Sequence, residues 1–102
     1  FEGIFPDANS VKKIAFDLKR EIDNLILLIG ANVGGKSLLT VMIHEELVEQ
    51  KNLNCSVIIE SMAKSIQGGG GGQDFYATAG GKNIDGLTAA LEKGIKILKE
   101  KF

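Results

Sequence analysis

The sequence predicts a small α/β (α+β) domain in which a short sheet packs with three main helices. Three segments repeat apolar residues at helical spacing, over about 8–21, 55–66 and 83–98. Between the first two, the apolar run at 24–30 is typical of a buried strand. With 102 residues, of which 44% are apolar, the chain has room for one small globular domain.

Charge and cysteine content limit the possible functions. The chain has 12 basic and 13 acidic side chains and a net charge of −1, which gives no bulk attraction to nucleic acid. A local patch or a groove lined by backbone can still bind phosphate. Arg20 is the one arginine, which disfavours bidentate recognition of bases. Cys55 is the one cysteine, so the chain can form no internal disulfide and no cysteine-based zinc site.

The sequence favours a cytoplasmic location. A single cysteine is typical of reducing compartments. No apolar run approaches the roughly 20 residues of a membrane span, so we expect no membrane partner. The chain begins FEGIFPDAN, without Met, and we expect residues 1–102 to be one domain of a longer protein.

The first helix is predicted from Ala8 to Glu21. Pro6 and Asp7 mark its start, and Asp23-Asn24 interrupts the pattern after it. Its expected apolar face consists of Val11, Ile14, Ala15, Leu18 and Ile22.

Residues 30–37, GANVGGKS, match the phosphate-loop pattern G-x-x-x-x-G-K-[ST] of nucleotide-binding proteins. The apolar run NLILLI precedes the loop, and Glu60 ends a second strand-like run in the place of a magnesium-binding acid. Too few residues follow Ser37, however, for a doubly wound sheet. The alternative is a β-hairpin, in which Gly34-Gly35 turns the chain and Lys36-Ser37 opens the return strand.

The segment after Ser37 decides between these two interpretations. A helix over SLLTVMIHEELVEQK would support nucleotide binding, whereas a strand KSLLTVMI followed by a polar turn would support the hairpin. The β-branched residues Thr40, Val41 and Ile43 favour the strand. A strand from Leu38 to Ile43 is therefore the prediction, and a helix beginning at Lys36 would contradict it.

The second half of the chain is predicted to hold two more helices and a short strand. Asn54 is the expected cap of a helix that ends at the glycine run 68–72. A strand is expected at 75–79, followed by a turn at Gly80-Gly81. Asn83 or Asp85 should cap the last helix. The apolar positions of these two helices are Val57, Ile58, Ser61, Met62 and Ile66, and then Leu87, Ala90, Leu91, Ile95 and Leu98.

The stretch QGGGGGQDFYATAGGKN, residues 67–83, has two interpretations. Glycine runs are typical of flexible linkers. This run, however, lies inside the expected domain, directly after an amphipathic helix, and a second glycine pair follows it. Glycines in such a place can let backbone N–H groups line a groove that a phosphate or a sugar approaches closely.

The same stretch resembles the glycine-rich signature of the DHHA1 domain, in the form that ends bacterial alanyl-tRNA synthetases. That family has a helix, several glycines, A-x-A-G-G and a final amphipathic helix. Here A-x-A-G-G is Ala77, Thr78, Ala79, Gly80 and Gly81. The resemblance extends from about Phe5 to Leu98 and implies a DHHA1-like fold, with a hairpin of strands at about 24–30 and 36–43.

The residues after the glycine run depart from the family pattern. The family often has a basic residue and then Pro there, whereas this chain has Gln73 and Asp74. A weaker phosphate contact is expected at that point. DHH phosphoesterases, which end in the same type of domain, carry a His after the glycines. Gln73 therefore favours the synthetase branch.

The resemblance implies a non-catalytic tRNA-binding C-terminal domain that assists aminoacylation and editing of tRNA(Ala). The parent chain would be an alanine-tRNA ligase that binds ATP and zinc elsewhere. The resemblance also implies a homodimer through the parent's C-terminal region, as in some members of the family. We expect no catalytic or metal-binding residues here. The predicted tRNA contacts are Gly70, Gly71, Gly72, Gln73, Gly80, Gly81 and Lys82.

Three other interpretations stay open at this point. They are a nucleotide-binding enzyme built on GANVGGKS, the substrate-binding domain of a DHH phosphoesterase, and a structural dimerisation domain that pairs through the last helix. His44 is expected to be a polar residue at a strand end, because no catalytic partner accompanies it. Cys55 is either an activated thiol at a helix start or an ordinary half-buried one. Phe75 and Tyr76 either stack on bases or pack in the core.

Overall fold

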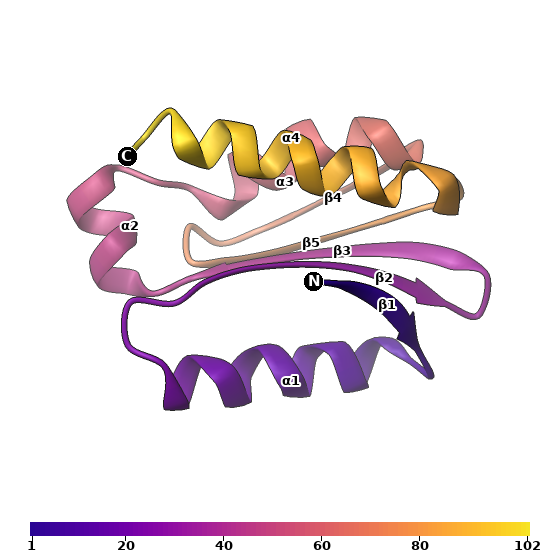
Figure 1. Ribbon diagram of the computed structural model, residues 1–102, viewed down its shortest axis with the longest axis horizontal. Coiled ribbons are helices and arrows are strands. Elements are labelled where there is room, and N and C mark those ends of the chain that lie inside the picture. The colour runs from indigo at the N-terminus through magenta and orange to yellow at the C-terminus, as the bar shows by residue number, and fades with distance from the viewer.

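A computed structural model that describes residues 1–102 shows a five-stranded sheet through the middle of the molecule (Figure 1). The strands lie side by side in the order β1-β2-β3-β5-β4. β1 is parallel to β2, and every other neighbouring pair is antiparallel. Along the chain the strands are β1 Glu2–Phe5, β2 Ile26–Val33, β3 Lys36–Ile43, β4 Gly68–Gly72 and β5 Tyr76–Gly81.

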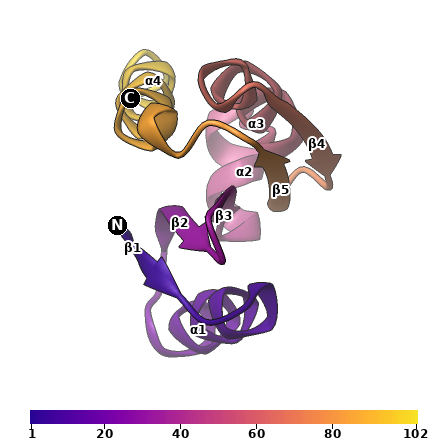
Figure 2. The ribbon, with the colours of Figure 1, turned by 90° about the vertical axis from the view of Figure 1, so that its right-hand side faces the viewer.

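Helices cover both faces of this sheet. α1 packs against β1, β2 and β3 on one face, and α3 and α4 lie on the other, as the view along the strands shows (Figure 2). The helices are α1 Ala8–Glu21, α2 Glu45–Lys51, α3 Cys55–Ala63 and α4 Leu87–Lys99, with short 3₁₀ turns η1 Lys64–Ile66 and η2 Ile84–Gly86. The predicted α/β (α+β) class is thus confirmed. None of the helices has the length and apolar character needed to cross a bilayer.

Two apolar cores lie on the two sides of the sheet. The larger core has 17 buried residues, from the sheet and from α3 and α4, and the smaller has six, centred on α1. β3 contributes to both, because successive side chains of a strand point to opposite faces. Leu39, Val41 and Ile43 belong to the larger core and Met42 to the smaller one. Burial on both faces explains why this segment shows no clear alternation in the sequence.

α1 has the predicted bounds. A carboxylate oxygen of Asp7 accepts a hydrogen bond of 2.7 Å from the backbone N–H of Ser10, and this capping bond lowers the pKa of Asp7. Val11 and Ala15 are buried against the sheet, as expected, whereas Ile14 and Ile22 stay exposed.

The segment GANVGGKS is the tip of a β-hairpin. Val33 pairs with Lys36, and the two residues between them, Gly34 and Gly35, have φ angles of 59° and 87°. Positive φ at both central residues is the requirement of a type I′ turn, which suits the twist of an antiparallel pair. Because β3 begins at Lys36, no helix starts there, and the phosphate-loop interpretation is wrong.

The structure differs from the predictions in four short elements. The glycine run is a strand, β4, and not a loop, and β5 includes the glycines expected to form a turn. β1, which was not predicted, pairs in parallel with β2. The expected polar turn after β3 is the short helix α2. Five glycines carry no side-chain pattern, and elements as short as β1 and α2 depend on tertiary contacts.

The start of α4 also differs. The helix is preceded by η2, and no side chain caps either element. Asn83 instead donates a side-chain hydrogen bond of 3.3 Å to the carbonyl oxygen of Ser65. This amide therefore ties η2 to η1, and the prediction that Asn83 or Asp85 caps the helix is wrong.

The Asn54 cap of α3 provides a test of the local structure. The side-chain oxygen of Asn54 accepts from the N–H groups of Ser56 at 2.9 Å and Val57 at 3.4 Å. Asn54→Ala should lower the free energy of unfolding by about 1 kcal/mol, measured by urea denaturation, because these donors lose their acceptor. Asn54→Ser, which keeps an acceptor, should match the unsubstituted chain to within a few tenths of a kcal/mol. Equal stability of both variants would contradict this role.

Candidate nucleic-acid interface

The glycine strand β4 forms one edge of the sheet. It pairs with β5 on one side and has no strand on the other (Figure 2). An edge strand presents unpaired backbone N–H and C=O groups to its surroundings. Because all five residues of β4 are glycine, no side chain stands in front of these groups. The result is a strip of accessible backbone.

The glycines of β4 fall into two sets. At Gly68, Gly70 and Gly72 an added Cβ would lie less than 3.0 Å from backbone atoms of β5. Glycine is required at these positions because the two backbones approach closely. At Gly69 an added Cβ would meet nothing within 4 Å, and at Gly71 it would meet only the Ser56 hydroxyl oxygen, at 3.7 Å.

Nothing inside the fold requires glycine at Gly69 or Gly71. Both have space for a side chain, and neither has a positive φ. A β-branched residue at either place would suit a strand better. The two glycines leave the edge of the sheet unobstructed. Their lack of side chains therefore indicates a partner that approaches the backbone from outside.

The glycine pair of β5 divides in the same way. A Cβ on Gly81 would collide with the backbone of Ile66 in η1, so this glycine serves the packing of the domain. Gly80 is exposed, and a Cβ there would make only an ordinary contact of 3.9 Å with the Ser37 carbonyl oxygen. Gly80 therefore belongs with Gly69 and Gly71 among the glycines that the fold does not require.

Gln73 and Lys82 lie at opposite ends of the β4–β5 pair. Gln73 follows Gly72 in the connecting turn and donates its backbone N–H to Tyr76, whereas Lys82 follows Gly81, the partner of Gly68. Four strand steps, about 13 Å, separate these two ends. The structure therefore does not bring these two predicted contact residues together.

The pairing of β4 with β5 also shows which residues of this strip the sequence-based prediction of the site missed. Gly68 lies beside Gly81, and Gly69 lies beside Gly80. Both belong to the same strip as the predicted Gly70, Gly71 and Gly72. Folding the sequence back as an antiparallel pair across the QDF turn would have placed them there.

The aromatic residues Phe75 and Tyr76, which follow this strip in the chain, face the protein. The Tyr76 ring packs against Phe16 of α1 with centroids 5.1 Å apart, and burial raises the pKa of the Tyr76 hydroxyl. The ammonium group of Lys19 lies 4.5 Å above the centre of the Phe75 ring and 2.5 Å from a carboxylate oxygen of Glu45. Both rings therefore pack against the protein, as the second interpretation from the sequence expected, and do not stand free to stack on bases.

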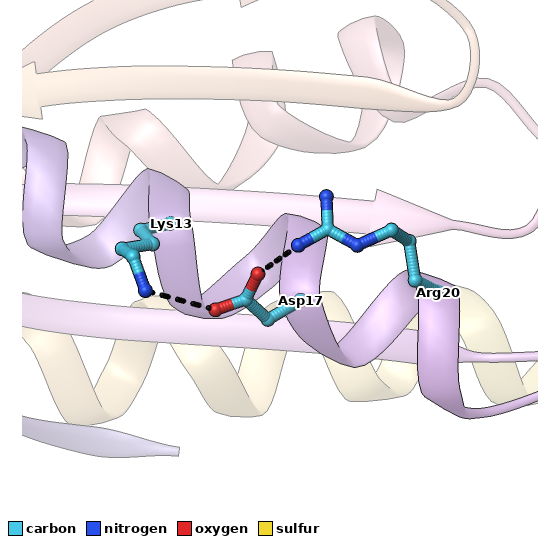
Figure 3. Close-up of polar contacts among 3 residues, drawn as sticks. All are labelled: Lys13, Asp17 and Arg20. Atoms are coloured by element: carbon cyan, nitrogen blue, oxygen red, sulfur yellow. Dashed lines mark hydrogen bonds and ion pairs between the residues drawn. The ribbon is translucent and has the colours of Figure 1, made fainter.

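Three of the four cations of α1, Lys13, Lys19 and Arg20, are engaged by carboxylates. Asp17 accepts from Lys13 at 3.4 Å on one oxygen and from Arg20 on the other (Figure 3). The hydrogen bond from Lys19 lowers the pKa of Glu45. The one arginine of the chain is thus not free to recognise a ligand without giving up this ion pair.

His44 and Cys55 serve the fold. His44 is the N-cap of α2, and its Nδ1 accepts from the backbone N–H of Glu46 at 3.3 Å. The Cys55 thiol is completely buried, and burial raises its pKa to about 12. A thiol with so high a pKa forms almost no thiolate near neutral pH, so Cys55 is neither activated nor half-buried.

The last helix faces the core. Leu87, Leu91 and Leu98 are buried within the domain, and of the four residues that a pairing helix would present, only Ile95 is exposed, by 45%. The stripe is therefore occupied within the chain, and the dimerisation interpretation in this form is wrong.

The division of the glycines can be tested by stability alone. Gly70→Ala should lower the free energy of unfolding by about 1–3 kcal/mol, because its methyl group would overlap the Thr78 carbonyl oxygen of β5. Gly69→Ala, the matched control, should leave the stability unchanged or raise it by up to about 1 kcal/mol. Both are measured by urea denaturation of the 102-residue chain. Equal effects of the two substitutions would show that the sets do not differ.

Comparison with known proteins identifies relatives of almost the whole chain, including this edge of the sheet. A family model described as the DHHA1 domain matches residues 4–100. The alanine–tRNA ligase of Cytophaga hutchinsonii is 45% identical over 96 residues, 94% of this chain, and that of Christiangramia forsetii is 53% identical over 93 residues, 91% of it. In each case the match covers 11% of the relative, so the chain spans about a tenth of the length of these ligases.

A solved structure has the same fold. The C-Ala domain of the Aquifex aeolicus alanyl-tRNA synthetase superimposes with a TM-score of 0.79, over 99% of this chain and 86% of that one, at 24% sequence identity. The glycine strip lies inside the part of the chain that the family model covers. On this evidence the chain belongs to the DHHA1 domain family.

Proposed function

We propose that this chain is a non-catalytic, tRNA-binding C-terminal domain of an alanine–tRNA ligase. The relatives that match most of the chain carry the name of that enzyme, and each is much longer than the match. In this proposal residues 1–102 form one domain of a cytoplasmic parent protein. ATP, zinc and the chemistry of aminoacylation and editing belong to other parts of that parent.

The observation that carries the proposal is the bare glycine edge. Backbone N–H groups can donate hydrogen bonds to phosphate and sugar oxygens of RNA, including the 2′-hydroxyl. An RNA backbone can reach such donors only where no side chain holds it away. Gly69 and Gly71 supply that access without being required by the fold, and Gly80 leaves the face of the neighbouring strand β5 free of a side chain.

The mode of binding follows from the charge of the chain. A net charge of −1 and an arginine already paired with Asp17 favour recognition of RNA shape over contacts from basic side chains. Lys82, which is exposed beside the Gly68–Gly81 pair, adds attraction to phosphate. Gln73 contributes a neutral contact at the other end, next to Asp74, which repels phosphate.

A substitution at Gly69 tests the contact directly. Gly69→Val should leave the stability of the domain unchanged, because its Cβ meets no neighbour. It should weaken binding of a tRNA(Ala) transcript by about tenfold or more, since the loss of even two backbone hydrogen bonds costs about 1–3 kcal/mol. Fluorescence anisotropy at fixed salt measures the affinity.

A matched control places the same valine side chain elsewhere. Ala89→Val changes an exposed position of α4, on the far side of the sheet from α1, and should leave the affinity unchanged. If Gly69→Val bound tRNA as tightly as the unsubstituted chain, the glycine edge would not be the binding surface.

Salt dependence tests the charged residue of the site. Lys82→Glu should weaken tRNA binding and reduce the slope of log affinity against log salt by about one. Lys96→Glu on α4 makes the same charge change at an exposed position outside the strip and should leave both quantities unchanged. Unchanged affinity and slope for Lys82→Glu would remove Lys82 from the site.

A further inference from the structure

The fold brings three lysines from separate segments to one end of the sheet. We call this end, where the β2–β3 hairpin turns, the hairpin end. Lys36 begins β3, one residue before the pair Ser37–Gly81, and Lys82 follows Gly81 on the neighbouring strand. Lys64 begins η1, whose last residue, Ile66, accepts backbone hydrogen bonds of 3.1 Å from Lys82 and from Asn83. Main-chain bonds therefore hold all three attachment points together.

None of these three lysines has a carboxylate partner. All three are exposed, and the ion pairs of the chain involve only Lys13, Lys19 and Arg20. Asp85, in η2, is the nearest acidic residue along the chain to Lys82, and it forms no ion pair. Neighbouring like charges without a counter-ion repel one another, so an anion between them stabilises the arrangement.

The opposite end of the sheet has an acidic cleft. We call this end the α2 end. Glu49 of α2 and Asp74 of the β4–β5 turn line one surface cleft there, together with Glu45, which is paired with Lys19. The glycine strip runs from Gly68 at the hairpin end to Gly72 beside this acidic cleft. A polyanion on the strip is thus attracted at one end and repelled at the other.

We propose that Lys36 of the hairpin tip and Lys64 of η1 bind RNA phosphates together with Lys82, and so fix where the RNA lies on the glycine strip. This inference rests on the proposed function, since it places the same RNA. It gives the GANVGGKS segment a role: its type I′ glycine turn carries Lys36 out beside Lys82. The two glycines of the turn leave open space around the tip, because an added Cβ at either would meet nothing within 4 Å.

The test compares two double variants of the 102-residue chain. Lys36→Gln/Lys64→Gln removes the two new charges and keeps Lys82. Lys99→Gln/Lys101→Gln removes two lysines at the C-terminal end of α4, which lies at the α2 end of the molecule (Figure 1). Affinity for a tRNA(Ala) transcript is measured by fluorescence anisotropy at several salt concentrations, and urea denaturation checks that each variant is folded.

Removing Lys36 and Lys64 should weaken tRNA binding by about tenfold at 0.1 M salt. It should also lower the slope of log affinity against log salt by about 1.4–1.8, since each phosphate contact contributes about 0.7–0.9 to that slope. The control variant should keep the original slope. An unchanged slope for Lys36→Gln/Lys64→Gln, in a chain whose binding still falls with Lys82→Glu, would overturn this inference and leave the proposed function standing. Absence of tRNA binding by the unsubstituted chain would instead overturn the proposed function itself.

Discussion

The close approach of the backbones of β4 and β5 is the constraint on which the candidate interface depends. Three of the five glycines of β4 are required because any Cβ there would overlap the backbone of β5. Strands normally keep their side chains above and below the sheet, out of the way of their neighbours. A strand whose Cβ directions point at its neighbour is therefore restricted to glycine at alternate positions. The remaining two glycines then determine what the outer edge can do.

An all-glycine edge strand is unfavourable in isolation. Glycine loses more conformational entropy on ordering than any other residue, and it adds no side-chain packing to a sheet. The domain offsets this on the inner side, where β5 is also paired with the central strand β3 and where α3 and η1 lie close to β4. Gly81, packed under Ile66, continues the same close contact into η1. The edge is thus held in place by its neighbours and not by its own residues.

The sequence was sufficient for elements that carry a side-chain pattern and insufficient for those that do not. α1 has the predicted bounds, Asn54 caps α3, and the hairpin turns at the predicted glycine pair. β4 could not be predicted as a strand, because glycine has no side chain to alternate. β1 is four residues long and pairs with residues about thirty positions away. In the candidate site, the glycine region could be found by sequence. The division of these glycines into positions that the fold requires and positions that it does not could not be predicted. It depends on whether the Cα–Cβ direction at each glycine points toward β5.

The arrangement of charge reconciles a net charge of −1 with an RNA-binding surface. The attraction and repulsion from opposite charges cancel only at a ligand that lies close to both. β3 has eight residues, so the sheet is about 26 Å long, whereas the Debye length at 0.1 M salt is about 10 Å. A phosphate near Lys36 and Lys82 is therefore screened from Glu45, Glu49 and Asp74 at the α2 end. The local attraction at the hairpin end persists in a chain with more acidic than basic residues, and the distant carboxylates act only on RNA that extends along the strip toward them.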